Sequence, residues 1–327
     1  MQTHRYNFDW SELAFGSKKP LRELNAIFIA APREISSERF TQLVREWLPK
    51  GNIVLGLALE DYVDGFAGQP QFRTLQLKNV EAIINKVNPA KSPHKIYTLS
   101  YFQRDLTHIL EKIAFKHHLF MNGSWHKSFH TLPPYYTLVN QHRSYQLISP
   151  FVDEAEARSY AIKLEKQLVK THPLPAKNNT LTEAAMMQTA LTAAAHSFDY
   201  SFQTGVALGK AVRDGYTFLA ATYNAVVPFQ TYAMHYGASR ETHFSPPHDL
   251  NHYDTVHAEV FLILKAAAEK VDLRGTTFFI STLPCPTCAR MLSQTDIKEF
   301  VYLNDHSEGY AAGLFEKTGK KIRRLAL

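Results

Sequence analysis

The sequence predicts an α/β protein of two domains, on three observations. Short apolar runs alternate with helical patterns, which favours sheets covered by helices. The chain has 327 residues, more than the roughly 250–300 at which a single core stops growing. A polar run with two prolines ends at Thr180, between two helical patterns. We therefore expect an N-terminal domain at residues 1–170, a linker at 171–180 and a C-terminal domain at 181–327.

In the N-terminal domain, short apolar runs bounded by turn residues predict strands, and the stretches around them have helical spacing. The strands are expected at residues 24–32, 52–59 and 95–102, and the helices at 36–49, 77–87, 104–115 and 154–168. This alternation predicts a mostly parallel sheet. Residues 119–151 are rich in aromatic and turn residues, and we expect antiparallel strands there.

The C-terminal domain opens with an alanine-rich helical pattern, for which Thr180 or Thr182 is the expected N-cap. A hairpin at 205–224 turns near Asp214-Gly215, and an irregular stretch follows at 225–254. Helices and strands then alternate at residues 257–271, 276–282, 284–292, 299–305, 309–319 and 320–327. A helix between the last two strands makes them parallel, because the connection is too long for a direct hairpin.

The composition excludes several classes of protein. With 45% hydrophobic and 20% charged residues, it is that of an ordinary globular protein. No apolar run approaches the ~18–20 residues that a membrane helix needs, and the first residues lack the apolar stretch of a signal peptide. We expect a cytoplasmic protein without a membrane partner. Its two cysteines cannot build a disulfide framework, and a C-x-x-C step in a reducing compartment indicates redox or metal chemistry.

The net charge of +6 is concentrated in the N-terminal half. Residues 1–180 contain 23 lysines and arginines against 16 aspartates and glutamates, whereas residues 181–327 contain 13 against 14. A basic half suggests a polyanionic partner such as RNA or single-stranded nucleic acid, although a soluble domain that happens to be basic gives the same count. This half has no glycine-rich phosphate-binding motif of the P-loop or dinucleotide kind.

Three residues of the C-terminal domain form a candidate metal site. His257, Cys285 and Cys288 each fall at or near the start of an expected helix, where backbone N–H groups favour the thiolate form of cysteine. The two cysteines stand three residues apart, so both sulfurs lie on one face of the first helical turn. One imidazole and two thiolates suit Zn²⁺. We expect one zinc ion in this domain.

A site with three protein ligands leaves one position for water, which is typical of catalytic zinc. Glu259 follows His257 by two residues and can enter the same pocket without ligating the metal. We expect it to accept a proton from the zinc-bound water, the nucleophile, and to pass that proton to a leaving nitrogen. H-x-E followed by P-C-x-x-C is the signature of zinc-dependent base deaminases.

Residues 181–327 resemble the catalytic domain of the cytidine deaminase-like superfamily, in the order of their helices and strands and in this signature. The resemblance implies a three-layer α/β/α fold around a five-stranded mixed sheet. It implies that His257, Cys285 and Cys288 hold Zn²⁺ and that Glu259 is the catalytic proton shuttle. It further implies substrate contacts from Asn224 and from the backbone beside Ala258.

The parallel last two strands, and histidine rather than cysteine at position 257, resemble the tRNA adenosine deaminase and deoxycytidylate deaminase branch. The N-terminal domain departs from the minimal members, which suggests a bacterial subfamily with its own added domain. The long segment before His257 carries candidate ligands for a second metal: His235, His243, His248 and His252.

Three functions stay open at this point. The first is deamination of cytosine or adenine, to uracil or hypoxanthine, in RNA or single-stranded nucleic acid presented by the N-terminal domain. The second is deamination of a free nucleotide such as deoxycytidylate, with a regulatory or oligomerising N-terminal domain. The third is an inactive binding module of the same fold, against which the presence of Glu259 argues. Homo-oligomers are common among such folds, and the sequence does not decide the oligomeric state.

Overall fold

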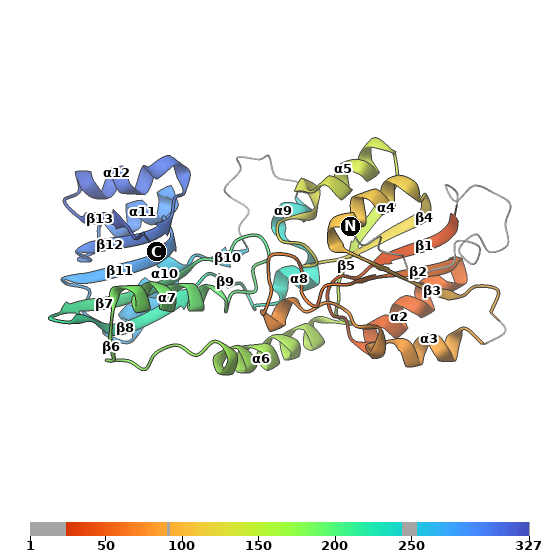
Figure 1. Ribbon diagram of the computed structural model, residues 1–327, viewed down its shortest axis with the longest axis horizontal. Helices are drawn as coiled ribbons and strands as arrows, with labels where there is room; N and C mark the ends of the chain where they lie inside the picture. Colours follow the sequence, from red (N-terminus) through yellow and green to blue (C-terminus); the bar gives the residue numbers. More distant parts are fainter. Residues whose placement is uncertain (1–23, 90–91, 244–253, 327) are drawn as a thin grey trace. The chain divides into compact units, whose positions relative to one another are not determined.

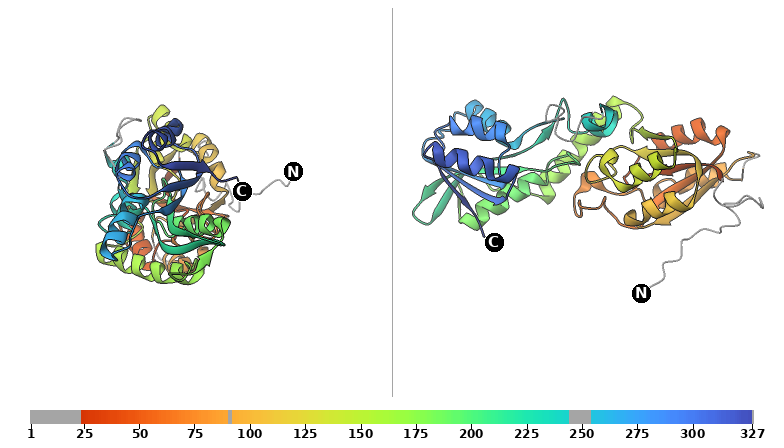
Figure 2. Two further views of the ribbon diagram at one scale, coloured as in Figure 1. Left: turned by 90° about the vertical axis from the view of Figure 1, so that its left-hand side faces the viewer. Right: turned by 90° about the horizontal axis from the view of Figure 1, so that it is seen from above.

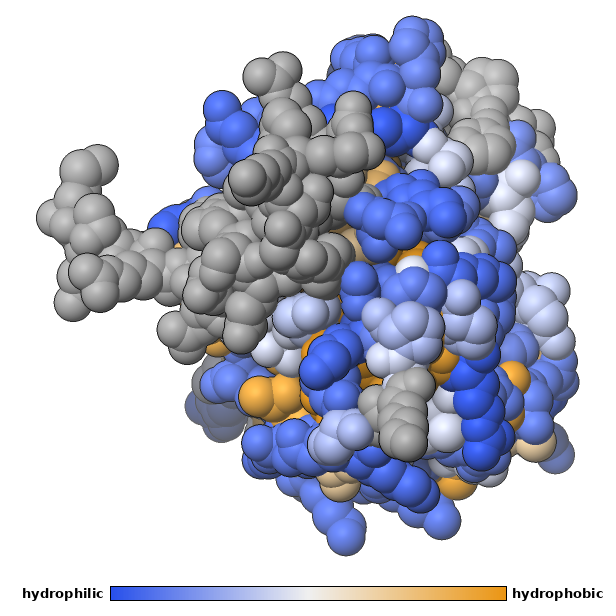
Figure 3. All heavy atoms as spheres, turned by 90° about the vertical axis from the view of Figure 1, so that its right-hand side faces the viewer, coloured by the Kyte–Doolittle hydropathy of each residue, from blue (hydrophilic) through white to orange (hydrophobic). Residues whose placement is uncertain are grey.

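The computed structural model describes residues 24–89, 92–243 and 254–326. Its internal contacts divide the chain into two compact units. Unit 1 comprises Met1–Tyr160 and Thr231–His252, and unit 2 comprises Ala161–Gln230 and Tyr253–Leu327. Within the described ranges, no helix is both long and apolar enough to cross a membrane. Hydrophilic side chains cover most of the coloured surface on the face in Figure 3, where hydrophobic ones form small separate groups.

Unit 1 is built on a five-stranded sheet in which every pairing is parallel. The strand order is β3-β2-β1-β4-β5, so the direction of winding reverses between β1 and β4 (Figure 1). The bounds are β1 Leu24–Ala30, β2 Asn52–Ala58, β3 Ile96–Tyr101, β4 Phe115–Met121 and β5 Tyr145–Ile148. The expected parallel sheet is thus confirmed.

Helices cover both faces of this sheet (Figures 1 and 2), because its strands are apolar on both sides. Ile27 and Ile29 of β1 pack on one face against α2 and α3, and Phe28 packs on the other against α4. The helices are α2 Ser37–Trp47, α3 Glu81–Val87, α4 Leu106–Lys112 and α5 Pro133–Asn140. The later part of unit 1 adds α8 Tyr232–Tyr236 and α9 Ser239–Thr242.

The expectation of antiparallel strands at residues 119–151 was wrong. The segment begins with the end of β4, then forms α5 and returns as β5, which pairs with β4 in parallel. Pro133 stands in the first turn of α5, where a missing N–H costs no hydrogen bond. The aromatic composition favoured strands, but a parallel pair requires a crossover, and α5 supplies it.

Unit 2 has three layers, as expected, and its last two strands are parallel. The sheet has the order β13-β12-β11-β7-β8-β6. One face packs on α10, α11 and α12, and the other on α7. A two-residue edge strand, β6, is the addition to the expected five. The elements are β6 Thr180–Leu181, α7 Glu183–Ala194, β7 Gly205–Val212, β8 Gly215–Tyr223, α10 Ala258–Ala268, β11 Thr276–Thr282, α11 Pro286–Ser293, β12 Glu299–Asn304, α12 Tyr310–Lys317 and β13 Lys321–Arg324.

The two units do not follow the contiguous division at 1–170, 171–180 and 181–327. Their first boundary, between Tyr160 and Ala161, falls inside the long helix α6 Glu154–Thr171, where no change of composition marks it. Residues 231–252 belong to unit 1 instead of the C-terminal part. Polar contacts hold them there: the Thr231 hydroxyl donates to Ala157 O at 2.7 Å, and buried Glu241 accepts from Phe129 N at 2.6 Å.

Candidate metal centre

Two helix N-termini bring the three candidate ligands together. His257 is the N-cap of α10, and it follows the short strand β10 Thr255–Val256, which pairs with β9 Ala225–Val226. Cys285 is the N-cap of α11, and its sulfur accepts from Cys288 N at 3.5 Å. Both helices pack on the same face of the sheet, and their first turns meet there, since the three ligand atoms lie within 4.8 Å of one another.

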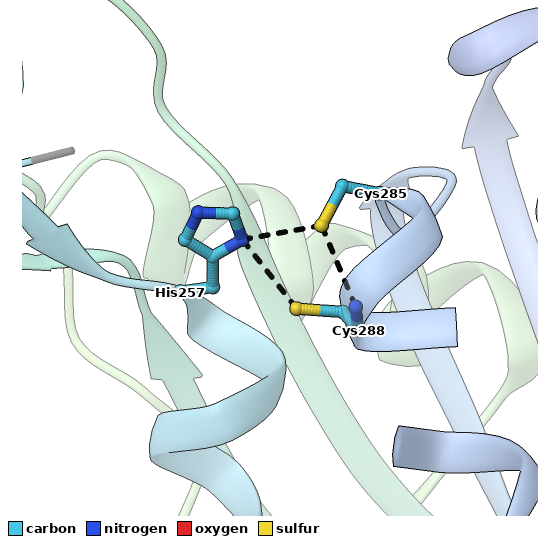
Figure 4. A group of neighbouring side chains, drawn as sticks. All are labelled: His257, Cys285 and Cys288. Carbon is cyan, nitrogen blue, oxygen red and sulfur yellow. Dashed lines mark hydrogen bonds between the residues drawn. The ribbon is translucent and has the colours of Figure 1, made fainter. Parts of the chain in front are cut away.

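The three side chains converge in the geometry that zinc requires (Figure 4). His257 Nδ1 lies 3.6 Å from Cys285 Sγ and 3.4 Å from Cys288 Sγ, and the three ligand atoms are all within 4.8 Å of one another. Zinc bonds of about 2.3 Å to sulfur and about 2.0 Å to nitrogen at a tetrahedral angle separate S from N by about 3.5 Å. The residues present therefore fit Zn²⁺.

Hydrogen bonds inside the triad lower the pKa of one thiol and raise the pKa values of the other thiol and of the imidazole. The pKa of Cys285 is lowered to about 3, first by a hydrogen bond from Cys288 and then by His257. The pKa of Cys288 is raised because that same hydrogen bond retains its proton. The pKa of His257 is raised by its bond with Cys285. Because a metal needs both thiolates and a neutral imidazole, metal binding releases protons from these groups.

Glu259 lies in the first turn of α10 and is 3% exposed. Burial raises its pKa to about 7, against smaller opposing effects of backbone N–H groups and His257. Its carboxylate also interacts with the Cys288 side chain. A carboxylic acid with a pKa near neutrality can both accept and return a proton at ordinary pH.

Asn224 lies just beyond β8 and is buried. Its Oδ1 accepts from Thr204 N at 2.8 Å, and its Nδ2 donates to Phe202 O at 2.8 Å and to Asp199 Oδ2 at 3.1 Å. The side chain therefore fixes the loop 199–204. Its expected contact with substrate remains a prediction.

Ala258 is fully buried, and its carbonyl accepts from the Thr222 hydroxyl at 2.8 Å. A contact between its backbone and substrate likewise remains a prediction. Neither Thr222 nor Asp199 was predicted as a site residue from the sequence. The charge of Asp199 contributes to the raised pKa of His257. An aspartate followed by polar residues is typical of an Asx turn, and this could have indicated Asp199. In the structure its Oδ1 accepts from Ser201 N at 2.7 Å, as in such a turn.

We expected a second metal site among the histidines before His257. In the part of the chain that the structure describes, the triad is the one group of side chains that could hold a metal ion. His235 Nδ1 lies 2.7 Å from the Ser149 hydroxyl, and His243 is exposed. His248 and His252 lie outside the described residues.

Residues 181–304 match a family model described as the cytidine and deoxycytidylate deaminase zinc-binding region. The deoxycytidylate deaminase of Enterobacteria phage T2 is 36% identical over 53 residues, which are 16% of this chain and 28% of the phage protein. ComE operon protein 2 of Bacillus subtilis (strain 168) is 31% identical over 74 residues, which are 22% of this chain and 39% of that protein. The chain thus spans less than half the length of these curated relatives.

Among solved structures, the dCMP deaminase from the cyanophage S-TIM5 in complex with dCMP and dUMP is similar to 44% of this chain, over 96% of its own length, with 21% identity and a TM-score of 0.34. A structure from work on A-to-I editing by tRNA:A34 deaminases covers 43% of this chain and 98% of its own, with 17% identity and a TM-score of 0.28.

Proposed function

We propose that the protein is a zinc-dependent hydrolase that removes the exocyclic amino group of a cytosine or adenine base; the match of residues 181–304 to a cytidine and deoxycytidylate deaminase zinc-binding region supports this. One observation carries the proposal: an imidazole and two thiols at tetrahedral spacing, with the buried carboxyl of Glu259 beside them. A purely structural zinc site has four protein ligands and needs no such carboxyl.

In this proposal His257 Nδ1, Cys285 Sγ and Cys288 Sγ hold one Zn²⁺. The bound ion supplies Lewis acidity, which lowers the pKa of a water molecule enough for attack on the base near neutral pH. The helix N-termini at His257 and Cys285 add backbone N–H dipoles that favour the two thiolates. Asn224 holds the loop 199–204, and we propose that it also orients the substrate.

Glu259 moves the proton. Hydrolysis forms a C–O bond at the carbon that bears the amino group, breaks the C–N bond and releases ammonia. Glu259 takes a proton from the attacking water and delivers it to the departing nitrogen. Its burial supports this role, because desolvation favours the protonated carboxyl and so opposes the usual preference of a glutamate for the charged form.

Two observations favour two different substrate classes. The excess of basic residues in 1–180 favours a base within RNA or single-stranded nucleic acid, for which these residues would supply the phosphate contacts. The similarity to phage deoxycytidylate deaminase favours a free cytosine nucleotide. Either substrate would present the same amino-bearing ring to the zinc site.

The test is to incubate the zinc-loaded protein separately with cellular RNA, single-stranded DNA and deoxycytidylate, and to quantify products by nucleoside mass spectrometry. We expect uracil or hypoxanthine in one fraction, and loss of that product by about 10²–10⁴-fold in Glu259→Gln with unchanged zinc content. Glu316→Gln, at an exposed carboxylate of the same unit, is the matched control. Equal turnover by Glu259→Gln and the wild type would refute the proposed mechanism.

Salt dependence separates the two substrate classes. If a polymer binds through phosphate contacts, the logarithm of its association constant falls linearly with the logarithm of salt concentration, with a slope of several units. A free nucleotide has no condensed counterions to release, so its association constant should depend much less steeply on salt concentration. Absence of binding to RNA and single-stranded DNA at low salt would exclude a polymeric substrate.

A further inference from the structure

The sheet of unit 1 has a feature that the zinc chemistry does not use. Its winding reverses between β1 and β4, which pair in parallel with Ala30 beside Phe120. In open α/β sheets, ligands bind beyond the carboxyl ends of the strands at such a reversal. The segments that leave these two ends are residues 31–36 and residues 122–128.

The first of these segments carries a completely buried arginine. Arg33 is 0% exposed. Its Nη2 donates to Gln71 O and its Nη1 to the sulfur of Met234, each at 2.8 Å, while its Nε has no hydrogen-bond partner. Among the described residues no ion pair involves Arg33.

The buried guanidinium of Arg33 has few strong hydrogen-bond acceptors. It has five N–H donors, and a thioether is a weak acceptor. The Tyr160 hydroxyl interacts with the guanidinium and donates to Glu34 Oε2 at 3.5 Å, so the Glu34 carboxylate is linked to Arg33 only through a neutral group. Buried charges in proteins are normally paired with an opposite charge. The position of Arg33 therefore favours a negatively charged ligand.

The second segment adds two buried side chains with unused hydrogen-bonding capacity. Asn122 is 4% exposed and Ser124 is 0% exposed. Asn122 Oδ1 and Ser124 Oγ have no hydrogen-bond partner. Most buried polar groups in folded proteins are bonded, so an unbonded one calls for an explanation such as a ligand.

Helix α8 and the glycine that follows it touch both segments. Met234 contacts Arg33, and a Cβ placed on Gly237, three residues later, would lie 3.8 Å from Asn122 Nδ2. Arg33 and Asn122 thus both neighbour the stretch from Met234 to Gly237, within unit 1.

We propose that Arg33, Asn122 and Ser124 bind the phosphate group of a small molecule. The phosphate oxygens accept from Arg33 Nε and from the Ser124 hydroxyl, and they neutralise the buried charge. Asn122 Oδ1 accepts from a phosphate or sugar hydroxyl. Because Arg33 is closed off from solvent, the ligand enters by displacing Met234, exchanging a thioether for a charged oxygen at the guanidinium.

The probe is radiolabelled inorganic phosphate, measured by equilibrium dialysis on the full, zinc-loaded chain with chloride at matched ionic strength. We expect one phosphate per chain, and binding weakened about tenfold or more in Arg33→Met. Arg73→Met, at an exposed arginine of the same unit, is the matched control and should bind as the wild type does. Met234→Leu removes the competing sulfur and should tighten binding a few-fold.

Ser124→Ala and Asn122→Ala keep the experiment decisive if Arg33→Met does not fold, and both should weaken phosphate binding. Ribose 5-phosphate and deoxycytidylate then compete with the label: displacement that depends on Arg33 identifies a phosphate ester as the ligand, and displacement by inorganic phosphate alone identifies the free ion. No saturable binding by the wild type at millimolar phosphate, or equal binding by all variants, overturns the proposal.

Discussion

Replacing Cys288 by serine removes one sulfur from the candidate metal centre while preserving the first turn of α11. Cys288 is 3% exposed and its sulfur lies 3.4 Å from His257 Nδ1, so the smaller, protonated hydroxyl cannot replace the thiolate. Structural zinc sites contribute roughly 10–16 kcal/mol, or about 3–4 kcal/mol for each of four ligands. We therefore expect zinc affinity to fall by about 10²–10³-fold.

This loss also appears as a loss of stability. Zinc at about 1,000 times its dissociation constant stabilises the folded wild type by about 4 kcal/mol, and at the same zinc concentration the variant should retain only about 0.4–1.4 kcal/mol of this. A competition titration against a chromophoric chelator measures the affinity, and thermal unfolding with and without zinc measures the stabilisation. Ser293→Ala, on the same helix, is the control. Zinc affinity within about tenfold of the wild type would refute a three-ligand site.

Three further predictions concern single groups. In zinc-free protein, Cys285 should be alkylated by iodoacetamide at about pH 6, where an ordinary thiol is unreactive, because its lowered pKa keeps the thiolate present as pH falls; mass spectrometry of the labelled peptide checks this, and labelling only above about pH 8 would contradict it. Thr182→Ala removes the N-cap that accepts from Ala185 N, and should lower the free energy of unfolding by about 1 kcal/mol in a urea titration. Glu241→Ala leaves the buried Phe129 N without its acceptor at 2.6 Å and should lower the free energy of unfolding by about 1–3 kcal/mol. Limited proteolysis of unit 1 should then be faster than in the wild type. Equal protection would count against the packing of Glu241 in unit 1.

Local patterns predicted the elements that carry the candidate metal centre. The strand expected at 276–282 has the same bounds in the structure, because turn residues on both sides of a short apolar run fix where the strand begins and ends. The expected start of the next helix was also close, since Pro286 and Cys285 together mark a helix N-terminus. The convergence of the triad followed from residue types and spacing, which this chemistry constrains tightly.

Other features depend on partners that no local pattern reveals. The bond that holds Glu241 in unit 1 goes to a backbone N–H 112 positions away, and a main-chain partner has no sequence signal. The crossover helix α5 was missed because Tyr135 and Tyr136 favour strands by propensity, whereas the parallel sheet requires a helix between β4 and β5. Arg33 stood in a turn where an arginine is ordinarily exposed, so its burial could not be foreseen.

The interleaved chain order of the two units has a consequence for how the protein is made. During synthesis the N-terminal part emerges first, but unit 1 is incomplete until Thr231–His252 has followed, and by then Ala161–Gln230 of unit 2 has also left the ribosome. Domains generally fold as units, N-terminal first. Until that segment is made, Met234 cannot contact Arg33 and Glu241 cannot accept from Phe129 N, although Ala161–Gln230 of unit 2 has already been synthesised. When Gln230 has been synthesised, both units are therefore incomplete. Unit 1 is completed by Thr231–His252 and unit 2 by Tyr253–Leu327, which is made last.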